Sequence, residues 1–173
     1  MNLPQLIFSD IDGVWTDGGM FYSTDNIELK KFNTSDSAGV LMLKELDIPL
    51  VIITGENSPT VYNRCKKLKI ESYYLGIKNK LNLAREIIHE RSIPLSKCAF
   101  IGDDINDLPL LREVGLSCCP NNAPDYIKKE VNIVTSKKGG DGAFREFIET
   151  VLQREGKLAS VIDQLVRKQI LNQ

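Results

Sequence analysis

Short apolar runs alternate with amphipathic segments along most of the chain. Each run has the length of a strand, and the segments between them carry apolar residues at helical spacing. This alternation predicts an α/β fold, with a mostly parallel sheet flanked by helices. The predicted strands are residues 6–9, 50–54, 72–75, 99–102, 116–119 and 132–134, and the predicted helices are 38–46, 59–68, 80–91, 108–113, 124–130 and 143–153.

One segment departs from this alternation. Residues 18–23 and 27–32 are strand-like runs separated by Thr24, Asp25 and Asn26. They predict a β-hairpin of about residues 18–33, inserted after the first strand. Its apolar residues would suit an interface or could pack on their own domain; they are Met20, Phe21, Ile27, Leu29 and Phe32.

The C-terminal tail, about residues 156–173, has the spacing of one more amphipathic helix. We expect it to pack on its own domain or on a neighbouring subunit. Its apolar positions are Leu158, Val161, Ile162, Leu165 and Val166.

Composition sets limits on the function. The 173 residues, 42% hydrophobic and 26% charged, are typical of one globular domain spanning residues 1–173. A net charge of −1 gives no electrostatic reason to bind nucleic acid or a membrane. We find no signal-peptide pattern and no run long enough to span a bilayer, and therefore expect a cytoplasmic protein.

The cysteines and the one histidine exclude other chemistries. Cys65, Cys98, Cys118 and Cys119 form no Cys-x-x-Cys pair, which speaks against a zinc site. His89 lies in a helical pattern away from the other motifs, so a Ser-His-Asp triad is not supported.

Polar residues that can do chemistry follow several of the predicted strands. In an open parallel sheet, ligands bind outside the carboxyl ends of the strands, so these residues should meet at one edge. Each alone could be a turn or a helix cap, but together they indicate one site. They are Asp10 and Asp12 after 6–9, Thr54 and Gly55 after 50–54, Lys80 at a helix start, and Gly-Asp-Asp-Ile-Asn-Asp at 102–107.

These residue types suggest phosphoryl transfer. Carboxylates at two strand ends suit Mg²⁺. One carboxylate can attack phosphorus to form an aspartyl-phosphate, and the second can act as acid and then as base. Thr54, backbone N–H groups near Gly55, and Lys80 can hold phosphate oxygens.

The motifs resemble those of the haloacid dehalogenase phosphatase superfamily, which is Rossmann-like and Mg²⁺-dependent. The resemblance implies that Asp10 is the nucleophile and Asp12 the acid/base. It also implies that Asp10 and Asp103 bind the metal through side chains and Asp12 through its carbonyl. The matching residues are Asp10-Ile11-Asp12-Gly13-Val14-Trp15-Thr16, Thr54, Lys80 and Gly102-Asp103-Asp104.

Within the superfamily, the chain is similar to the 3-deoxy-octulosonate (KDO) 8-phosphate phosphatases, which are homotetramers. The interval between Asp12 and Thr54 holds only the hairpin and one helix, so no cap domain is expected. The similarity lies in the hairpin, in residues 33–39 and in residues 139–146. It implies that the substrate contacts residues of the 33–39 segment, namely Thr34, Ser35, Asp36, Ser37 and Ala38.

Position 56 departs from that group, which usually has Arg there. Glu56, with residues 15–22 and 31–39, looks closer to the phosphatase for 2-keto-3-deoxy-nononate (KDN) 9-phosphate. We expect a phosphorylated sugar acid, with the nine-carbon acid favoured over KDO 8-phosphate and an N-acylneuraminate 9-phosphate also considered. Arg64 and Lys67 are candidates for the substrate carboxylate or belong to a solvated helix face.

Two other classes remain to be weighed. Receiver domains of two-component signalling also phosphorylate an Asp, but theirs follows the third strand, where Tyr74, Leu75 and Gly76 stand here. A non-catalytic tetramerisation module of the same fold could lose its nucleophile, whereas Asp10 and Asp12 are both present.

Overall fold

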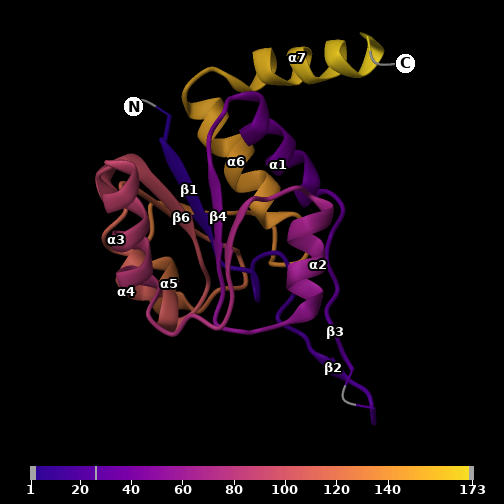
Figure 1. The fold of residues 1–173 in the computed structure, drawn as a ribbon. Coiled ribbons are helices and arrows are strands. Elements are labelled where there is room, and N and C mark those ends of the chain that lie inside the picture. Colours follow the sequence, from indigo (N-terminus) through magenta and orange to yellow (C-terminus); the bar gives the residue numbers. More distant parts are fainter. Residues whose placement is uncertain (1–2, 26, 172–173) are drawn as a thin grey trace.

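The computed structural model describes residues 3–25 and 27–171, and only the backbone at 169 and 171. Its centre is a six-stranded sheet in the order β5-β4-β1-β6-β7-β8, with every neighbouring pair parallel (Figure 1). The strands are β1 (Leu6–Ser9), β4 (Leu50–Ile53), β5 (Ser72–Tyr74), β6 (Cys98–Ile101), β7 (Leu116–Cys119) and β8 (Ile133–Val134). The predicted sheet is confirmed, with strand ends within one residue of those expected.

The strand order places a switch point beside β1. The chain runs from β1 to β4 and β5 on one side, then returns to β6, β7 and β8 on the other. Ser9 pairs with Ile52 of β4 and with Ile101 of β6, so the residues after these three strands emerge at one edge. A crevice at this point is where open α/β sheets bind ligands.

Helices cover both faces of the sheet (Figure 1). One face carries α1 (Asp36–Glu45), α2 (Pro59–Lys67), α6 (Ala143–Arg154) and α7 (Leu158–Leu171); the other carries α3 (Lys80–Arg91), α4 (Leu108–Leu111) and α5 (Asp125–Lys128). Two 3₁₀ turns, η1 (Leu95–Lys97) and η2 (Ile105–Asp107), flank β6. The predicted helix at 124–130 is shorter than expected, because Pro124 precedes its first turn and the chain leaves the helix after Lys128.

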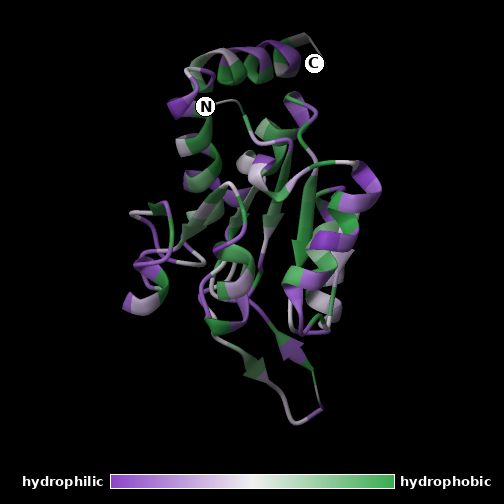
Figure 2. Cartoon of the chain, turned by 90° about the vertical axis from the view of Figure 1, so that its left-hand side faces the viewer, coloured by the Kyte–Doolittle hydropathy of each residue, from purple (hydrophilic) through white to green (hydrophobic). Residues whose placement is uncertain are grey.

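The strands alternate between two apolar layers. Ile7 faces the core under α1, α2 and α6, whereas Leu6 and Phe8 face the core under α3 to α5. Burial on both faces explains why the strands are nearly continuous apolar runs, which Figure 2 shows as largely green. The stacked rings of Trp15 and Phe144, 4.3 Å apart, join the loop after β1 to α6.

The hairpin projects from the carboxyl edge of the sheet, but its paired part is shorter than predicted (Figures 1 and 2). Only β2 (Phe21–Tyr22) and β3 (Glu28–Leu29) pair. The ladder ends because Lys30 turns inward to a carboxylate and Phe32 packs against the core. Phe21, Tyr22 and Leu29 remain exposed, while Asn26 lies outside the described residues.

The C-terminal helix α7 packs on its own domain. Val161 is buried, Leu158 and Leu165 lie against the core, and Lys168 Nζ is 2.7 Å from Glu45 Oε2 of α1. In Figure 1, α7 lies across the ends of α1 and α6, at the end of the molecule opposite to the hairpin. Residues 172–173 of the predicted tail are outside the described residues.

All four cysteines are buried free thiols, as the sequence predicts for Cys98 and Cys118. Within the described ranges, none of the helices has both the length and the apolar character needed to cross a bilayer.

Candidate active site

A buried lysine and two carboxylates form the centre of the carboxyl edge. Lys80, the first residue of α3, lies with its Nζ 2.8 Å from Asp10 Oδ1 and 2.6 Å from Asp107 Oδ1. Asn79 caps the helix by accepting from the Asn82 N–H, which fixes the position of Lys80 at the helix start. The prediction that Lys80 meets Asp10 is confirmed.

Asp107 is a site residue that the sequence analysis included in the 102–107 segment but to which it gave no role of its own. Its Oδ1 accepts from Lys80, and its Oδ2 accepts from the N–H groups of Asp103 and Asp104. It therefore connects the lysine to the loop after β6. The signal was an acidic residue four positions after Asp103, at the end of a turn that returns it to the strand end.

The carboxylates fit a divalent cation. One oxygen each of Asp10, Asp103 and Asp107 lies within 4.8 Å of the others. Oδ1 of Asp10 has Lys80 Nζ at 2.8 Å, whereas Oδ1 of Asp103 is buried and accepts no hydrogen bond from the residues that the structure describes. Buried polar atoms of this kind need a partner, and carboxylate oxygens are the ligands that Mg²⁺ prefers. A metal at these atoms would use Asp10 and Asp103, two of the three ligands that we predict.

The pKa shifts of these side chains also favour a bound cation. Burial and the charge of Asp107 raise the pKa of Asp10 to about 7, although Lys80 lowers it. Burial and the neighbouring aspartates raise the pKa of Asp103 to about 8. Burial lowers the pKa of Lys80, but the charges of Asp10 and Asp107 outweigh it and leave it raised. This excess of negative charge is what a bound cation would neutralise.

A glycine makes the close approach of Asp103 possible. Gly13 has a φ of +81°, and a Cβ at this position would overlap the Asp103 carboxylate. Only glycine adopts this conformation without strain and leaves that space free. The loop 139–142 packs onto the same turn, since the Gly140 N–H donates to Val14 O at 3.1 Å.

The predicted phosphate-binding residues follow β4. Thr54 is buried, and its hydroxyl oxygen accepts from the Glu56 N–H at 3.4 Å. Gly55 is exposed, with no side chain to cover the edge. Together they border the side of the site formed by β4, as expected from the strand order.

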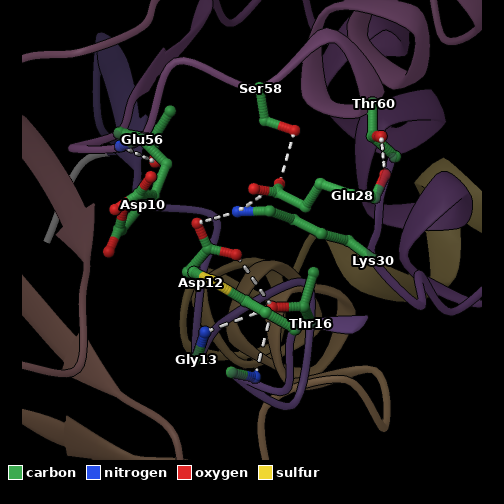
Figure 3. A network of polar contacts seen from close by, with 12 residues as sticks. Asp10, Asp12, Gly13, Thr16, Glu28, Lys30, Glu56, Ser58 and Thr60 are labelled. Carbon is green, nitrogen blue, oxygen red and sulfur yellow. Dashed lines mark hydrogen bonds and ion pairs between the residues drawn. The ribbon is translucent and has the colours of Figure 1, made fainter. Parts of the chain in front are cut away.

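Asp12, two residues after Asp10, contacts the hairpin and the turn that follows β1. Its Oδ2 lies 2.6 Å from Lys30 Nζ, and its Oδ1 accepts from the Thr16 hydroxyl at 3.3 Å (Figure 3). Sequence reasoning missed Lys30, because a lysine on a hairpin is usually solvated.

Residues 34–38 divide into two groups. Thr34 is exposed, and Ser35, Ser37 and Ala38 are half-buried. Asp36 is fully buried, and its Oδ1 accepts from the Arg145 N–H of α6 at 3.1 Å. Burial raises the pKa of Asp36 to about 6 despite this hydrogen bond. Asp36 thus connects α1 to α6, so its predicted contact with the substrate would be indirect.

The three remaining candidates for substrate binding differ in exposure and in hydrogen bonding; they are Glu56, Arg64 and Lys67. Arg64 donates to Asn33 O at 3.0 Å and to Ser37 Oγ at 3.2 Å, so it supports the 33–38 loop. Lys67 and Glu56 are exposed. Figure 3 shows Glu56 on the same side of the site as Asp10.

Comparisons with known proteins give a consistent result. The model for haloacid dehalogenase-like hydrolases matches residues 77–147. The 3-deoxy-D-manno-octulosonate 8-phosphate phosphatase of Haemophilus influenzae is 35% identical over 159 residues, covering 92% of this chain and 88% of that protein. The chain belongs to the haloacid dehalogenase-like phosphatases, in the group of the KDO 8-phosphate phosphatases.

Solved structures of this group agree with the fold. A Moraxella catarrhalis KDO 8-phosphate phosphatase in complex with magnesium, phosphate and KDO has a TM-score of 0.90 at 34% identity, covering 94% of this chain and 93% of that one. A cobalt-bound H. influenzae phosphatase of the group has a TM-score of 0.85 at 34% identity, covering 90% and 91%. These relatives are named for the eight-carbon acid, so the expected closeness to the nine-carbon enzyme is not confirmed.

Proposed function

We propose that this chain is a Mg²⁺-dependent phosphatase that hydrolyses the terminal phosphate of a 3-deoxy-2-keto sugar acid. The observation that carries the proposal is the Asp10–Lys80–Asp107 cluster with Asp103 at one sheet edge. The similarity to KDO 8-phosphate phosphatases over most of the chain supports the reaction type. Both acidic residues of the Asp-x-Asp motif are present, which speaks against a purely structural module.

The first step transfers the phosphoryl group to Asp10. A carboxylate oxygen of Asp10 attacks phosphorus, and the bond from phosphorus to the sugar oxygen breaks. The electron pair stays on the sugar oxygen, which takes a proton from Asp12. Lys80 holds Asp10 in place and offsets the charge on the phosphoryl oxygens.

The second step frees the enzyme. Asp12, now a carboxylate, takes a proton from water, and the resulting hydroxide attacks phosphorus. The bond between phosphorus and the Asp10 oxygen breaks, which restores the Asp10 carboxylate and releases inorganic phosphate.

A divalent cation would be held by Asp10, by Asp103 and, on our sequence-based prediction, by the carbonyl of Asp12. When bound, it supplies positive charge that neutralises the carboxylates and the transferring phosphoryl group. Asp107 contributes by keeping Lys80 and the Asp103 backbone in position.

KDO 8-phosphate is the substrate that the relatives support. The named relatives act on it, and one was crystallised with KDO. The octulosonate carries its phosphate on a terminal primary carbon, so Asp12 would have to protonate a poor alkoxide leaving group.

KDN 9-phosphate is the second candidate, and Glu56 favours it. An exposed carboxylate beside the site should repel the carboxylate of the sugar acid and accept hydrogen bonds from its hydroxyls. A longer polyol chain offers more hydroxyls to such a group. An N-acylneuraminate 9-phosphate shares this chain length and is a third substrate to test.

The test compares kcat/KM for phosphate release with Mg²⁺ from KDO 8-phosphate, KDN 9-phosphate and an N-acylneuraminate 9-phosphate. We expect turnover of at least one, and we expect Glu56→Arg to shift the ratio toward KDO 8-phosphate about tenfold, the size of one charge-assisted contact. Glu86→Arg, at an exposed position on α3, is the matched control. No release from any of the three sugar acids would contradict the proposal.

A further inference from the structure

Lys30 is a buried cation on an otherwise exposed hairpin. It follows β3 directly, and its side chain is 0% exposed although Leu29 beside it is exposed. The Nζ lies 2.6 Å from Asp12 Oδ2 and 3.5 Å from Glu28 Oε1 (Figure 3). Burying an ammonium costs free energy that two nearby carboxylates only partly offset. An apolar residue at this position would therefore stabilise the fold at least as much as the lysine does. The position of this lysine therefore needs a functional reason.

Asp12 is held through both of its oxygens. Lys30 occupies Oδ2, and the Thr16 hydroxyl donates to Oδ1 at 3.3 Å. The Thr16 oxygen in turn accepts from the Gly18 N–H at 3.2 Å. The Asp12 side chain is 19% exposed, so it is not fixed by packing alone. Without Lys30, its carboxylate would be free to rotate into other staggered rotamers.

Glu28 extends the contact to α2. Its Oε1 accepts from the Ser58 hydroxyl at 2.8 Å, and its carbonyl accepts from the Thr60 hydroxyl at 3.3 Å (Figure 3). Ser58 and Thr60 lie at the start of α2. The base of the hairpin is thus attached to the protein body by polar contacts, with Lys30 between Glu28 and Asp12.

We propose that Lys30 is a positioning residue that holds the Asp12 carboxylate in the orientation needed for proton transfer. The proposal rests on the function proposed above, in which Asp12 gives and then takes a proton. Lys30 acts through Asp12, while Glu28 and Ser58 keep Lys30 in place. The hairpin is then a part of the catalytic apparatus as well as an exposed apolar surface.

The test is Lys30→Met, which keeps an unbranched side chain, one atom shorter, and removes its charge. We expect kcat on KDO 8-phosphate to fall about a hundredfold, at the low end of general acid–base contributions, with KM within about twofold. Lys30→Arg keeps a cationic donor and should recover most of the loss. Lys31→Met is the matched control, because Lys31 is the next residue, is 67% exposed and lies 3.9 Å from Asp17.

A second substrate separates positioning from general damage. Nitrophenolate leaves p-nitrophenyl phosphate without protonation, so the first step should survive in Lys30→Met. The second step still needs Asp12 to take a proton from water. We therefore expect a burst of nearly one nitrophenolate per active site followed by slow turnover, whereas a distorted Asp10 would abolish the burst.

A crystal structure of Lys30→Met provides a readout besides activity. We expect the Asp12 carboxylate to leave the orientation that it has in Figure 3. An unchanged Asp12, or kinetics equal to those of Lys31→Met, would overturn the inference. If Lys30→Met does not fold, Lys30→Gln keeps a polar side chain of similar size and carries the same expectations.

The two proposals fail in different ways. If the wild-type protein releases no phosphate from the sugar acids, the proposed function is wrong, and the p-nitrophenyl phosphate and crystallographic tests of Lys30 still apply. If the wild-type protein hydrolyses KDO 8-phosphate and Lys30→Met matches its control, the function stands and the role of Lys30 is refuted.

Discussion

At the scale of single residues, the charge of Lys80 offsets the repulsion between carboxylates that are buried together at the edge of the sheet. Its ammonium lies between Asp10 and Asp107, and all three side chains are buried or nearly so. Removing one partner of a buried ionic cluster leaves the others without compensation, which costs far more than the intact pair contributes. The same cation that prepares the site for phosphate therefore holds the folded edge together.

We predict that Lys80→Met lowers the free energy of unfolding by about 3–5 kcal/mol at pH 8 and abolishes phosphate release. The measurement is urea denaturation without metal. Lys78→Met, at an exposed position in the same loop, is the control and should change stability little. A loss below about 1 kcal/mol would contradict the role given to Lys80.

Asp36 gives a pH-dependent prediction. Its folded-state pKa, about 6, is above the ordinary value of 3.8, so the folded protein binds its proton more tightly than the unfolded chain. Stability from this group is present below about pH 4 and lost as the pH rises through 6. Asp36→Asn keeps an oxygen that accepts the Arg145 N–H and carries no charge to bury.

We therefore predict that Asp36→Asn is more stable than the wild-type protein at pH 7.5, by roughly 1–3 kcal/mol, and that the difference shrinks toward pH 4. Chemical denaturation across this range measures it. Asp163→Asn, at an exposed position on α7, is the control. Parallel curves for Asp36→Asn and the wild-type protein would show that Asp36 is not a buried charge.

At the scale of elements, the contacts within the described part of the chain do not explain how the hairpin is stabilised. Two paired residues on each strand are too few for a stable isolated ladder. Phe21 and Leu29 pair across it, and the two residues are 64% and 59% exposed. Large exposed apolar side chains in one place are typical of interaction sites. This supports the homotetramer that the sequence analysis expects, which we put forward as a proposal.

We predict that the wild-type protein sediments as a tetramer and that the Phe21→Lys, Leu29→Lys double variant sediments as a smaller species. The body of the protein should unfold at the same denaturant concentration, because both side chains lie outside the core. Leu41→Lys, at an exposed apolar position on α1, is the control. A monomeric wild-type protein at micromolar concentration would refute the assembly.

At the scale of the whole molecule, the sequence predicts what depends on local pattern. Strands buried on both faces are continuous apolar runs, so β1, β4 and β6 were located within a residue. Once a parallel sheet is expected, Asp10 and Thr54 must lie at one edge because they follow parallel strands, and Lys80 lies 2.8 Å from Asp10.

What the sequence does not predict depends on contacts between distant segments. Lys30 reaches Asp12 across 18 positions, and Asp36 accepts from Arg145 across 109. Neither contact has a local pattern, since a lysine on a hairpin and an aspartate at a helix start are both common in solvent. The role of Asp107 within the 102–107 segment was not predicted for a related reason, because three acidic residues in six positions give no indication of which one turns inward.

The most direct test of the account is phosphate release from KDO 8-phosphate and KDN 9-phosphate by the wild-type protein and by Asp10→Asn, each with Mg²⁺ and with a chelator. We predict release from at least one of them by the wild-type protein with Mg²⁺ only, and none by Asp10→Asn, although that variant should fold. Equal release by Asp10→Asn would contradict the nucleophile. No release by the wild-type protein would contradict the assignment to sugar-acid phosphates.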